Sequence, residues 1–391
     1  MNHKRKWILL VAAVFFWAAQ LTAQSKKHNG GIWLPMPAVS ADTLMKARWT
    51  QEKANAYMER FGAVKGCNYA PRYNGPWWSD FREEIISEEL GWAHSIGLNS
   101  VRVFVPVYTW QDDKAVFYQR VDRFLEMCQR DSISVMIVFD TYGVKNPARK
   151  DKLRIIPDRE RTIKPGWHNG PSNAIEGIIP RNDSAHWPVI KTYVQEFAAK
   201  YASDKRIIAW DIYNEAWKKD TALMQDMFQW VREVNPSQPL TACWYASRFS
   251  DIITYHCYQR PGDRKGKKTL PGFPFFEEEI QHALSFHRPV LCTEWLARPF
   301  GNTVQSVLPV YAANNIGWYN WGLVAGSAQF RFPWEWPQGS PEPWIWFHDL
   351  LYPDGHPYNR DEIDAIQSFI FCKPDIDKKF GDEQGFWKVY P

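Results

Sequence analysis

The sequence has almost no excess of charge of one sign, which argues against a nucleic-acid partner. Its 391 residues include 47 basic and 43 acidic side chains. Three of the basic ones, Lys4, Arg5 and Lys6, belong to an N-terminal segment that we expect to be removed, and without them the counts are 44 and 43. A protein that binds nucleic acid needs a basic surface to hold the phosphates. We therefore expect no nucleic-acid partner.

The N-terminal apolar run is too short to span a bilayer. It covers Trp7 to Ala19, which is 13 residues, whereas a spanning helix needs about 20. Basic residues precede the run and the small residue Ala23 follows it, as in a secretory signal peptide. We expect residues 1–24 to be cleaved and the mature chain to be secreted or periplasmic, with no stable membrane anchor. An uncleaved anchor is the alternative.

Paired cysteines and clustered metal ligands are also missing. The six cysteines form no C-x-x-C pair, so neither a zinc ribbon nor a thioredoxin-type site is indicated. Cys67, Cys243, Cys257 and Cys292 fall in apolar, strand-like runs, where a free cysteine behaves as a small buried hydrophobe. No predicted strand end carries His-x-His, which disfavours a metal-dependent hydrolase. We expect no cofactor and no metal.

The sequence is rich in aromatic residues and in alternating patterns. Aromatic side chains make up 16% of the chain, enough to fill a core and to build flat surfaces on which sugar rings stack. Short apolar runs alternate with amphipathic ones, which is typical of repeated β-α units with strands covered on both faces. The predicted strands are Val64–Tyr69, Ser100–Val105, Ser134–Phe139, Ile207–Tyr213, Leu240–Tyr245, Ile252–Cys257, Pro289–Thr293 and Gly317–Leu323.

Eight such strands predict an α/β fold, a (β/α)8 TIM barrel that forms a single catalytic domain over residues 62–370. An N-terminal extension with a helix would cover 25–61, and a tail would cover 371–391. A doubly wound sheet is the alternative, but no G-x-G-x-x-G follows the first strand. Predicted helices include Phe81–Ser95, Tyr118–Arg130, His186–Tyr201 and Ala222–Val234.

Two connections are long, Thr141 to Asp183 and Val324 to Tyr358. Both follow predicted strands, and a barrel places its active site at the C-terminal ends of its strands. Two glutamates stand at such ends. Glu215 follows the fourth strand and Glu294 follows the seventh. Two carboxyl groups facing each other across a sugar are what glycosidic bond cleavage requires.

The residues at these strand ends resemble a known family. Asn214-Glu215, Glu294, Arg102, the His-x-Tyr of His256-Cys257-Tyr258, and Trp321 resemble the clan A retaining glycoside hydrolases, particularly family five. Over about residues 50–365 the chain is similar to a bacterial group labelled cellulase-like or 1,4-β-xylanase. The motifs of that narrower resemblance are Gly91-Trp92-Ala93, Leu98 to Phe104, Lys164-Pro165-Gly166, Cys292-Thr293-Glu294, Val324-Ala325-Gly326 and Trp346 to Leu350.

The resemblance implies a role for each of these residues. Glu294 would be the nucleophile and Glu215 the general acid, then the general base, with their carboxyls about 5–5.5 Å apart. Asn214 would hold the sugar 2-hydroxyl, Arg102 and Tyr258 would keep Glu294 ionised, and His256 would contact substrate or brace Glu215. Trp321 would be a platform for the sugar, which Trp77 and Trp78 could extend. The alternatives are a buried structural ion pair for Arg102, a core histidine for His256 and core packing for the tryptophans.

Two departures from the family pattern concern the binding of substrate. The histidine that usually follows strand three is missing, and Asp140 or His168 could take its place. Ala216-Trp217 follows the Asn-Glu pair where proline is frequent.

The sequence thus predicts a secreted retaining hydrolase of β-linked, most simply β-1,4-linked, glycans, with a poly- or oligosaccharide as its partner. The alternatives are a non-catalytic glycan-binding barrel and an exo-acting β-glycosidase on oligosaccharides.

Overall fold

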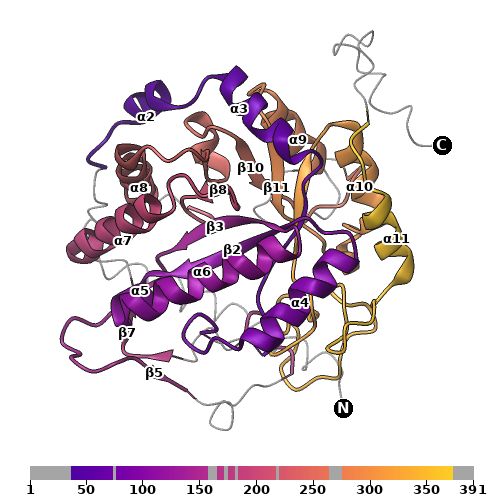
Figure 1. Ribbon diagram of the computed structural model, residues 1–391. Coiled ribbons are helices and arrows are strands. Elements are labelled where there is room, and N and C mark those ends of the chain that lie inside the picture. Colours follow the sequence, from indigo (N-terminus) through magenta and orange to yellow (C-terminus); the bar gives the residue numbers. More distant parts are fainter. Residues whose placement is uncertain are drawn as a thin grey trace, which may run out of the picture. The chain divides into compact units, whose positions relative to one another are not determined.

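The strands predicted from apolar runs form one parallel sheet. The computed structural model describes residues 37–73, 76–156, 165–170, 175–180, 184–216, 220–263 and 275–372. The sheet order is β10-β11-β12-β1-β2-β3-β8-β9. The predicted (β/α)8 barrel is confirmed (Figure 1). The strands are β1 (Lys65–Asn68), β2 (Ser100–Pro106), β3 (Ser134–Asp140), β8 (Ile207–Asp211), β9 (Leu240–Thr241), β10 (Ile253–His256), β11 (Val290–Glu294) and β12 (Gly317–Trp321).

Side-chain hydroxyls join the two ends of this sheet order. The hydroxyl of Thr241 in β9 donates to the carbonyl of Ile252, at 2.9 Å, and lies 2.9 Å from the hydroxyl of Thr254 in β10. The backbone amide of Asp251 also donates to the carbonyl of Leu240. These contacts bring the first and last strands of the order together, so that the barrel is nearly closed.

Helices pack outside the strands, and the residues at their ends favour the beginning or the end of a helix. Asp113 accepts a hydrogen bond from the amide of Val116 at the start of α6. Asn235 ends α8 in the left-handed conformation, and Pro236 follows. The helices are α2 (Ala41–Ala47), α3 (Gln51–Met58), α4 (Glu83–Ser95), α5 (Val107–Asp112), α6 (Lys114–Arg130), α7 (Trp187–Lys200), α8 (Thr221–Val234), α9 (Phe276–Leu284), α10 (Val304–Ala313) and α11 (Arg360–Ser368).

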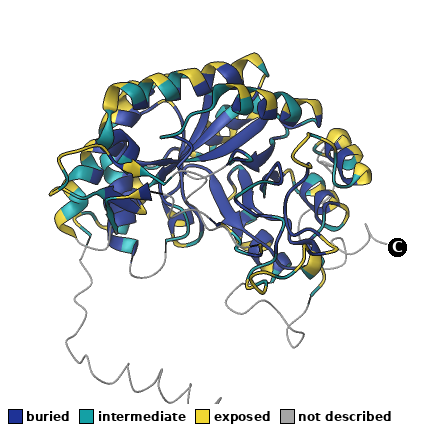
Figure 2. Cartoon of the chain, turned by 90° about the horizontal axis from the view of Figure 1, so that it is seen from below, coloured by how far each residue is buried: buried dark blue, intermediate teal, exposed yellow. Residues whose placement is uncertain are grey.

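Burial follows the barrel architecture. The strands are buried, and the outer faces of the helices are exposed (Figure 2). All four strand-associated cysteines are buried free thiols, as predicted. None of the described helices is long and apolar enough to cross a membrane. The predicted signal peptide, residues 1–24, lies outside the described residues, as do residues 373–391 of the predicted tail.

The structure differs from the sequence prediction at the fifth strand and in the loop after β3. The strand predicted to run through Tyr245 ends at Thr241, and Trp244–Arg248 form a 3-10 helix. The loop after β3 contains two antiparallel pairs. They are β4 (Gly143–Lys145) with β7 (Ile178–Pro180), and β5 (Arg154–Ile155) with β6 (Ile175–Glu176).

Candidate active site

Glu215 follows β8 in a conformation that turns the chain sharply. The five residues of β8 are all buried, which anchors the strand in the barrel. Four residues beyond Asp211, Glu215 has a φ of 49°, in the left-handed region that non-glycine residues seldom adopt. Such a backbone persists where the surrounding structure holds it, and it often marks a functional position. The turn brings the Glu215 carboxylate to the mouth of the barrel.

Glu294 is the last residue of β11, and it lies beside His256 at the end of β10. The register between the two strands shifts at Tyr255 and His256, so that His256 pairs with Glu294. A shift of this kind re-aims a side chain. His256 is fully buried and Glu294 is 5% exposed.

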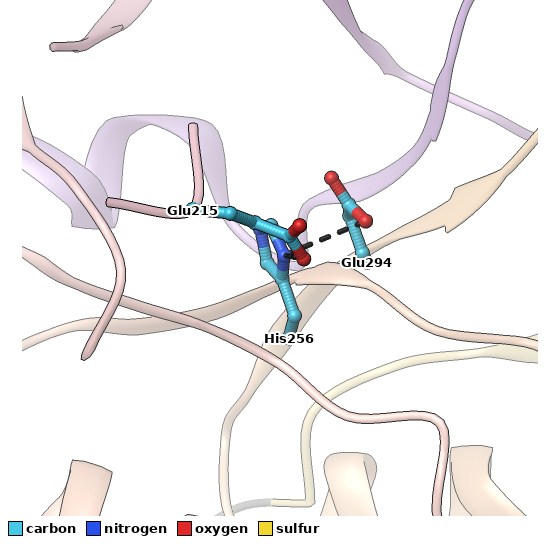
Figure 3. Close-up of side chains that lie close together, drawn as sticks. All are labelled: Glu215, His256 and Glu294. Atoms are coloured by element: carbon cyan, nitrogen blue, oxygen red, sulfur yellow. Dashed lines mark hydrogen bonds and ion pairs between the residues drawn. The ribbon is translucent and has the colours of Figure 1, made fainter. Parts of the chain in front are cut away.

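The side chains of Glu215, His256 and Glu294 converge, with their polar atoms turned toward one another (Figure 3). His256 Nδ1 lies 2.8 Å from Glu215 Oε1 and 3.4 Å from Glu294 Oε2. One oxygen of each carboxylate and one ring nitrogen all lie within 4.8 Å of one another. The structure therefore brings together the two predicted carboxyls and places an imidazole between them.

Arg102 on β2 is the central cation of the site. It is fully buried, and its Nη1 atom donates to Glu294 Oε1 at 3.0 Å. Its Nε and Nη2 atoms donate to Asp211 Oδ2 at 2.9 and 2.8 Å. Further bonds go to Asn214 Oδ1 at 2.6 Å and to Asn68 Oδ1 at 2.7 Å. Because Arg102 occupies the carbonyl oxygen of Asn214, the amide NH2 of Asn214 is the group that can donate to a substrate.

Sequence reasoning did not identify two partners of Arg102. Asp211 lies within the predicted fourth strand, and an acidic residue inside an apolar run was the only signal for it. Asn68, at the end of β1, also donates to the carbonyl of Thr293 at 2.7 Å. Asp211 balances the guanidinium charge, and Asn68 connects it to the strand that carries Glu294.

Tyr258 holds the second oxygen of Glu294. Its hydroxyl donates to Glu294 Oε2 at 2.9 Å, opposite the Arg102 bond to Oε1. Glu294 therefore has a donor on each oxygen, which fixes the orientation of the carboxylate. Arg102 and Tyr258, to which the resemblance assigns the role of keeping Glu294 ionised, both contact it.

The two carboxyl groups experience opposite electrostatic shifts. Burial raises the pKa of Glu294, with a further increase from the charge of Glu215, against the charges of His256 and Arg102. Burial acts in the same direction on Glu215, but the hydrogen bond and charge of His256, together with Arg102, outweigh it and lower the pKa. The imidazole of His256 contacts both carboxylates and acts to lower the pKa of each.

The short contact between Glu215 and His256 accommodates one proton in two ways. The proton can reside on Nδ1, which then donates to an ionised Glu215, or on Glu215, which then donates to Nδ1. Moving the proton to Glu215 leaves the imidazole neutral. In that state Glu294 keeps its bonds from Arg102 and Tyr258, which favour its ionised form and oppose the burial that raises its pKa.

Among the described residues, the same three side chains are close enough together to hold a metal ion. An ion there would compete with Arg102, whose Nη1 atom already lies 3.0 Å from Glu294. A guanidinium and a divalent cation at one carboxylate repel each other. The arrangement is therefore better suited to proton transfer and nucleophilic attack than to metal binding.

Trp321 ends β12, next to the strand of Glu294. It is partly exposed, and its ring packs edge-on against Phe104 and Phe330. Its Nε1 atom is buried and has no hydrogen-bond partner among the described residues. A partly exposed tryptophan ring suits an amphipathic ligand such as a sugar.

Trp77 and Trp78 are not brought to the catalytic pair. They are 6% and 2% exposed and stack on each other at 4.2 Å. Both rings contact Phe124 of α6, and Trp78 donates to the carbonyl of Phe104 at 2.7 Å. The structure places them in the core, because the loop after β1 folds back onto α6.

His168 and Asp140, the two substitutes for the missing histidine, lie in different surroundings. Asp140 ends β3 and accepts a hydrogen bond from the amide of Tyr142 at 2.9 Å. His168 lies against the rings of Trp334 and His348, and burial lowers its pKa to about 4. His168 is therefore a neutral aromatic group in the loop after β3.

The long loops after β3 and β12 are bound to each other. The amide of Gly166 donates to Gln329 Oε1 at 3.1 Å, and His168 Nδ1 lies 2.8 Å from the carbonyl of Phe332. Trp334 then packs on Tyr258, with ring centroids 5.0 Å apart. The joined loops therefore lie against the Tyr258 side of the catalytic pair.

The chain is similar to known proteins in its fold. The sequence matches no family model and no curated protein. The chain is similar to the structure of an exo-β-1,4-mannosidase from Opitutaceae bacterium strain TAV5, with a TM-score of 0.52 and 16% identity. That match covers 78% of this chain and 59% of the other, so the chain spans less than two thirds of that protein.

Two further similar structures are glycoside hydrolases. One is a family 5 mannosidase from Rhizomucor miehei, with a TM-score of 0.47, 14% identity, and coverage of 79% of this chain and 92% of the other. The other is a family 39 glycoside hydrolase from Bacteroides cellulosilyticus WH2, with a TM-score of 0.47, 13% identity, and coverage of 78% and 63%. The predicted resemblance to clan A glycoside hydrolases is confirmed at the level of the barrel fold.

Proposed function

We propose that this protein is a retaining glycoside hydrolase of β-linked glycans, with Glu294 as nucleophile and Glu215 as acid/base. The observation that carries the proposal is the placement of the two carboxyls. They stand at the ends of β8 and β11, with one oxygen of each within 4.8 Å of the other. Retaining enzymes separate their carboxyls by about 5–5.5 Å, whereas inverting enzymes leave room for a water at about 6.5–9.5 Å. The short separation supports retention.

The chemistry follows from the protonation states. An ionised Glu294, held by Arg102 and Tyr258, attacks the anomeric carbon. The glycosidic C–O bond breaks, and Glu215 gives its proton to the leaving oxygen. Glu215, now ionised, takes a proton from water as the water oxygen attacks the anomeric carbon. The bond to Glu294 breaks in the same step, and the sugar leaves with its configuration retained.

The proposed substrate is a β-1,4-linked glycan or its oligosaccharides, and the proposed location is outside the cytoplasm. The N-terminal pattern of basic, apolar and small residues supports export. The partly exposed Trp321 supports a sugar ligand. A mannoside belongs among the substrates to be tried, because the similar structure with the TM-score of 0.52 is an exo-β-1,4-mannosidase.

The joined loops favour exo action over endo action. Gly166 and Gln329, from the loops after β3 and β12, are hydrogen bonded, and Trp334 brings the assembly onto Tyr258. Loops joined on one side of the catalytic pair would admit a short end of a chain rather than its middle. Hydrolysis of an oligosaccharide should then release one sugar at a time, and early release of mixed lengths would contradict exo action.

The test is hydrolysis across a panel of aryl β-glycosides and polysaccharides, with wild type beside Glu294→Ala and with azide added. Loss of activity in the variant, and its partial rescue by azide with a glycosyl azide of inverted configuration, would support Glu294 as nucleophile. A wild-type protein that binds one of the polysaccharides without turnover would instead support the alternative of a non-catalytic glycan-binding barrel.

A further inference from the structure

Tyr258 packs apart from the main core of the barrel, although its hydroxyl contacts the proposed nucleophile. It lies two residues beyond His256, the last residue of β10. Among the described residues, its ring belongs to a small hydrophobic cluster with Ala297 and Phe347, separate from the main core. Ala297 follows β11, and Phe347 lies in the loop after β12. The bond from Tyr258 to Glu294 therefore depends on side chains that belong to loops.

The ring of Tyr258 contacts two rings from the loop after β12. The centroids of Tyr258 and His348 are 5.5 Å apart, with their planes at 46°. Those of Tyr258 and Trp334 are 5.0 Å apart, with their planes at 88°. Trp334 is partly exposed, whereas His348 is fully buried and out of reach of a substrate. An effect of His348 on the reaction must therefore pass through its neighbours.

His348 is bound to the chain just beyond the nucleophile. Its Nδ1 atom donates to the carbonyl of Leu296, two residues beyond Glu294. A carbonyl oxygen only accepts, so Nδ1 carries the proton of the ring. Burial lowers the pKa of His348 well below its ordinary value, which keeps the imidazole neutral. The ring thus has one anchor, and that anchor sets its tautomer.

Arg298 binds the backbone on both sides of His348. Its amide donates to the carbonyl of Phe347 at 3.3 Å, and its Nη2 atom donates to the carbonyl of Asp349 at 3.1 Å. Arg298 lies just beyond β11, the strand that ends at Glu294. The loop around His348 is therefore fixed relative to the nucleophile.

These contacts form a closed circuit around Glu294. The carbonyl of Leu296 holds His348, and the His348 ring packs on Tyr258. The Tyr258 hydroxyl then donates to Glu294 Oε2 at 2.9 Å. Because a hydrogen bond weakens steeply with poor distance and angle, the packing of the tyrosine ring decides how well its hydroxyl stabilises the carboxylate.

We propose that His348 is a positioning residue, which holds the ring of Tyr258 so that its hydroxyl meets Glu294. The inference rests on the proposed function, because it takes Glu294 as the nucleophile. His348 itself touches neither the substrate nor the reacting atoms. The loop after β12 is then part of the catalytic machinery as well as a border of the substrate site.

The experiment is a double-mutant cycle between His348 and Tyr258, on the glycoside that the panel identifies. His348→Ala should lower kcat/KM about tenfold, the lower end of the loss expected for Tyr258→Phe. In the Tyr258→Phe background the hydroxyl is already absent, so His348→Ala should change kcat/KM by less than about twofold. Losses that multiply in the double variant would overturn the inference, and so would an unchanged kcat/KM in His348→Ala.

The pH profile provides a second readout, which a purely structural role would not change. The Tyr258 bond lowers the pKa of Glu294, so a weaker bond should raise that pKa. The acidic limb of kcat/KM should move to higher pH in His348→Ala, as in Tyr258→Phe, with no further shift in the double variant. The same charged groups face Glu294 in all these variants, namely Glu215, His256 and Arg102. A limb that stays in place in His348→Ala would contradict the positioning role.

Two further variants separate positioning from folding. His348→Asn keeps an N–H donor for the carbonyl of Leu296 and should recover part of kcat/KM. His356→Ala removes an exposed histidine of the same loop and should leave kcat/KM unchanged. Urea unfolding tests each variant for folding, and His348→Asn replaces His348→Ala in the cycle if the alanine variant does not fold.

The outcomes for the inference and for the proposed function are distinct. Turnover by wild type with multiplying losses in the cycle would leave the proposed function standing and overturn the role of His348 alone. If wild type hydrolyses no member of the panel, the proposed function fails and the inference fails with it.

Discussion

His256 Nδ1 lies 2.8 Å from Glu215 Oε1 and 3.4 Å from Glu294 Oε2, so one ring nitrogen contacts both proposed catalytic carboxylates. The contact to Glu215 is the shorter. A proton in that contact can move between Nδ1 and Oε1 without changing the total charge of the pair, and from Oε1 it can pass to the leaving group.

Replacement of Glu215 should depend on the leaving group. Glu215→Ala removes the acid, so hydrolysis of an unactivated β-glycoside should fall by about 10²–10⁴-fold. Departure of a dinitrophenolate needs no proton, and that substrate should still give a burst of phenolate followed by a slow steady state. The measurement is stopped-flow release of the phenolate. Equal losses on both substrates would exclude Glu215 as the acid/base.

Removal of the Tyr258 hydroxyl should affect activity more than stability. Tyr258→Phe deletes the 2.9 Å bond to Glu294 Oε2 and leaves the Arg102 bond in place. Hydrogen bonds to charged groups contribute about 1.5–3 kcal/mol, so kcat/KM should fall roughly 10–100-fold. Kinetics and urea unfolding of the same preparation provide the check. A large fall in stability with normal kcat/KM would contradict this role.

Removal of the Arg102 guanidinium should destabilise the fold. Arg102→Met leaves Asp211 and Glu294 buried without their cation, and breaking a buried pair in this way costs about 3–5 kcal/mol. The matched control is Arg123→Met, whose solvent-exposed pair with Glu83 should contribute little to stability. Denaturant unfolding measures both changes. Equal free energies of unfolding for the two variants would refute the structural role of Arg102.

Stability should fall as pH rises through a window set by Glu279. Burial raises the pKa of this carboxyl from 4.5 to about 7. The folded protein then binds more protons than the unfolded chain between those values, so the free energy of unfolding decreases as pH rises from about 4.5 to about 7. Glu279→Gln should remove a decrease of roughly 1–3 kcal/mol. Unfolding at pH 5 and pH 8 tests this, with the exposed neighbour Glu278→Gln as control.

Chelation should leave activity unchanged. Glu215, His256 and Glu294 are close enough to bind an ion, but Arg102 already neutralises charge at Glu294. Dialysis against EDTA should therefore preserve hydrolysis of whichever glycoside the panel identifies. A loss that Zn²⁺ or Mn²⁺ restores would require a metal-based mechanism instead.

The strands and their terminal glutamates could be predicted from the sequence, because apolar runs that end in a charged residue are a local signal. Glu215 and Glu294 were found in this way, and Arg102, His256 and Tyr258 entered through the family resemblance. Asp211 and Asn68 were missed because their roles depend on a guanidinium from another strand. The sequence pattern around a residue cannot predict a contact with a side chain on another strand.

For the tryptophans, the sequence did not predict which side chains are buried and which are exposed. Trp77 and Trp78 were plausible platforms by their place after β1, but only the three-dimensional packing reveals that they face Phe124. Trp244 was hidden inside a predicted strand, because its residue type favours a strand while its backbone leaves one. Residue type alone does not tell a core tryptophan from an exposed one.

The bonds of Arg102 also have a consequence for how the protein folds. Its partners Asn68, Asp211 and Glu294 lie 34, 109 and 192 residues away along the chain. Contacts of such sequence separation carry a large loop-closure entropy and form late relative to local structure. A nascent chain cannot complete this cluster until β11 has been synthesised. Recovery of hydrolytic activity during refolding should therefore lag behind the recovery of helical circular dichroism.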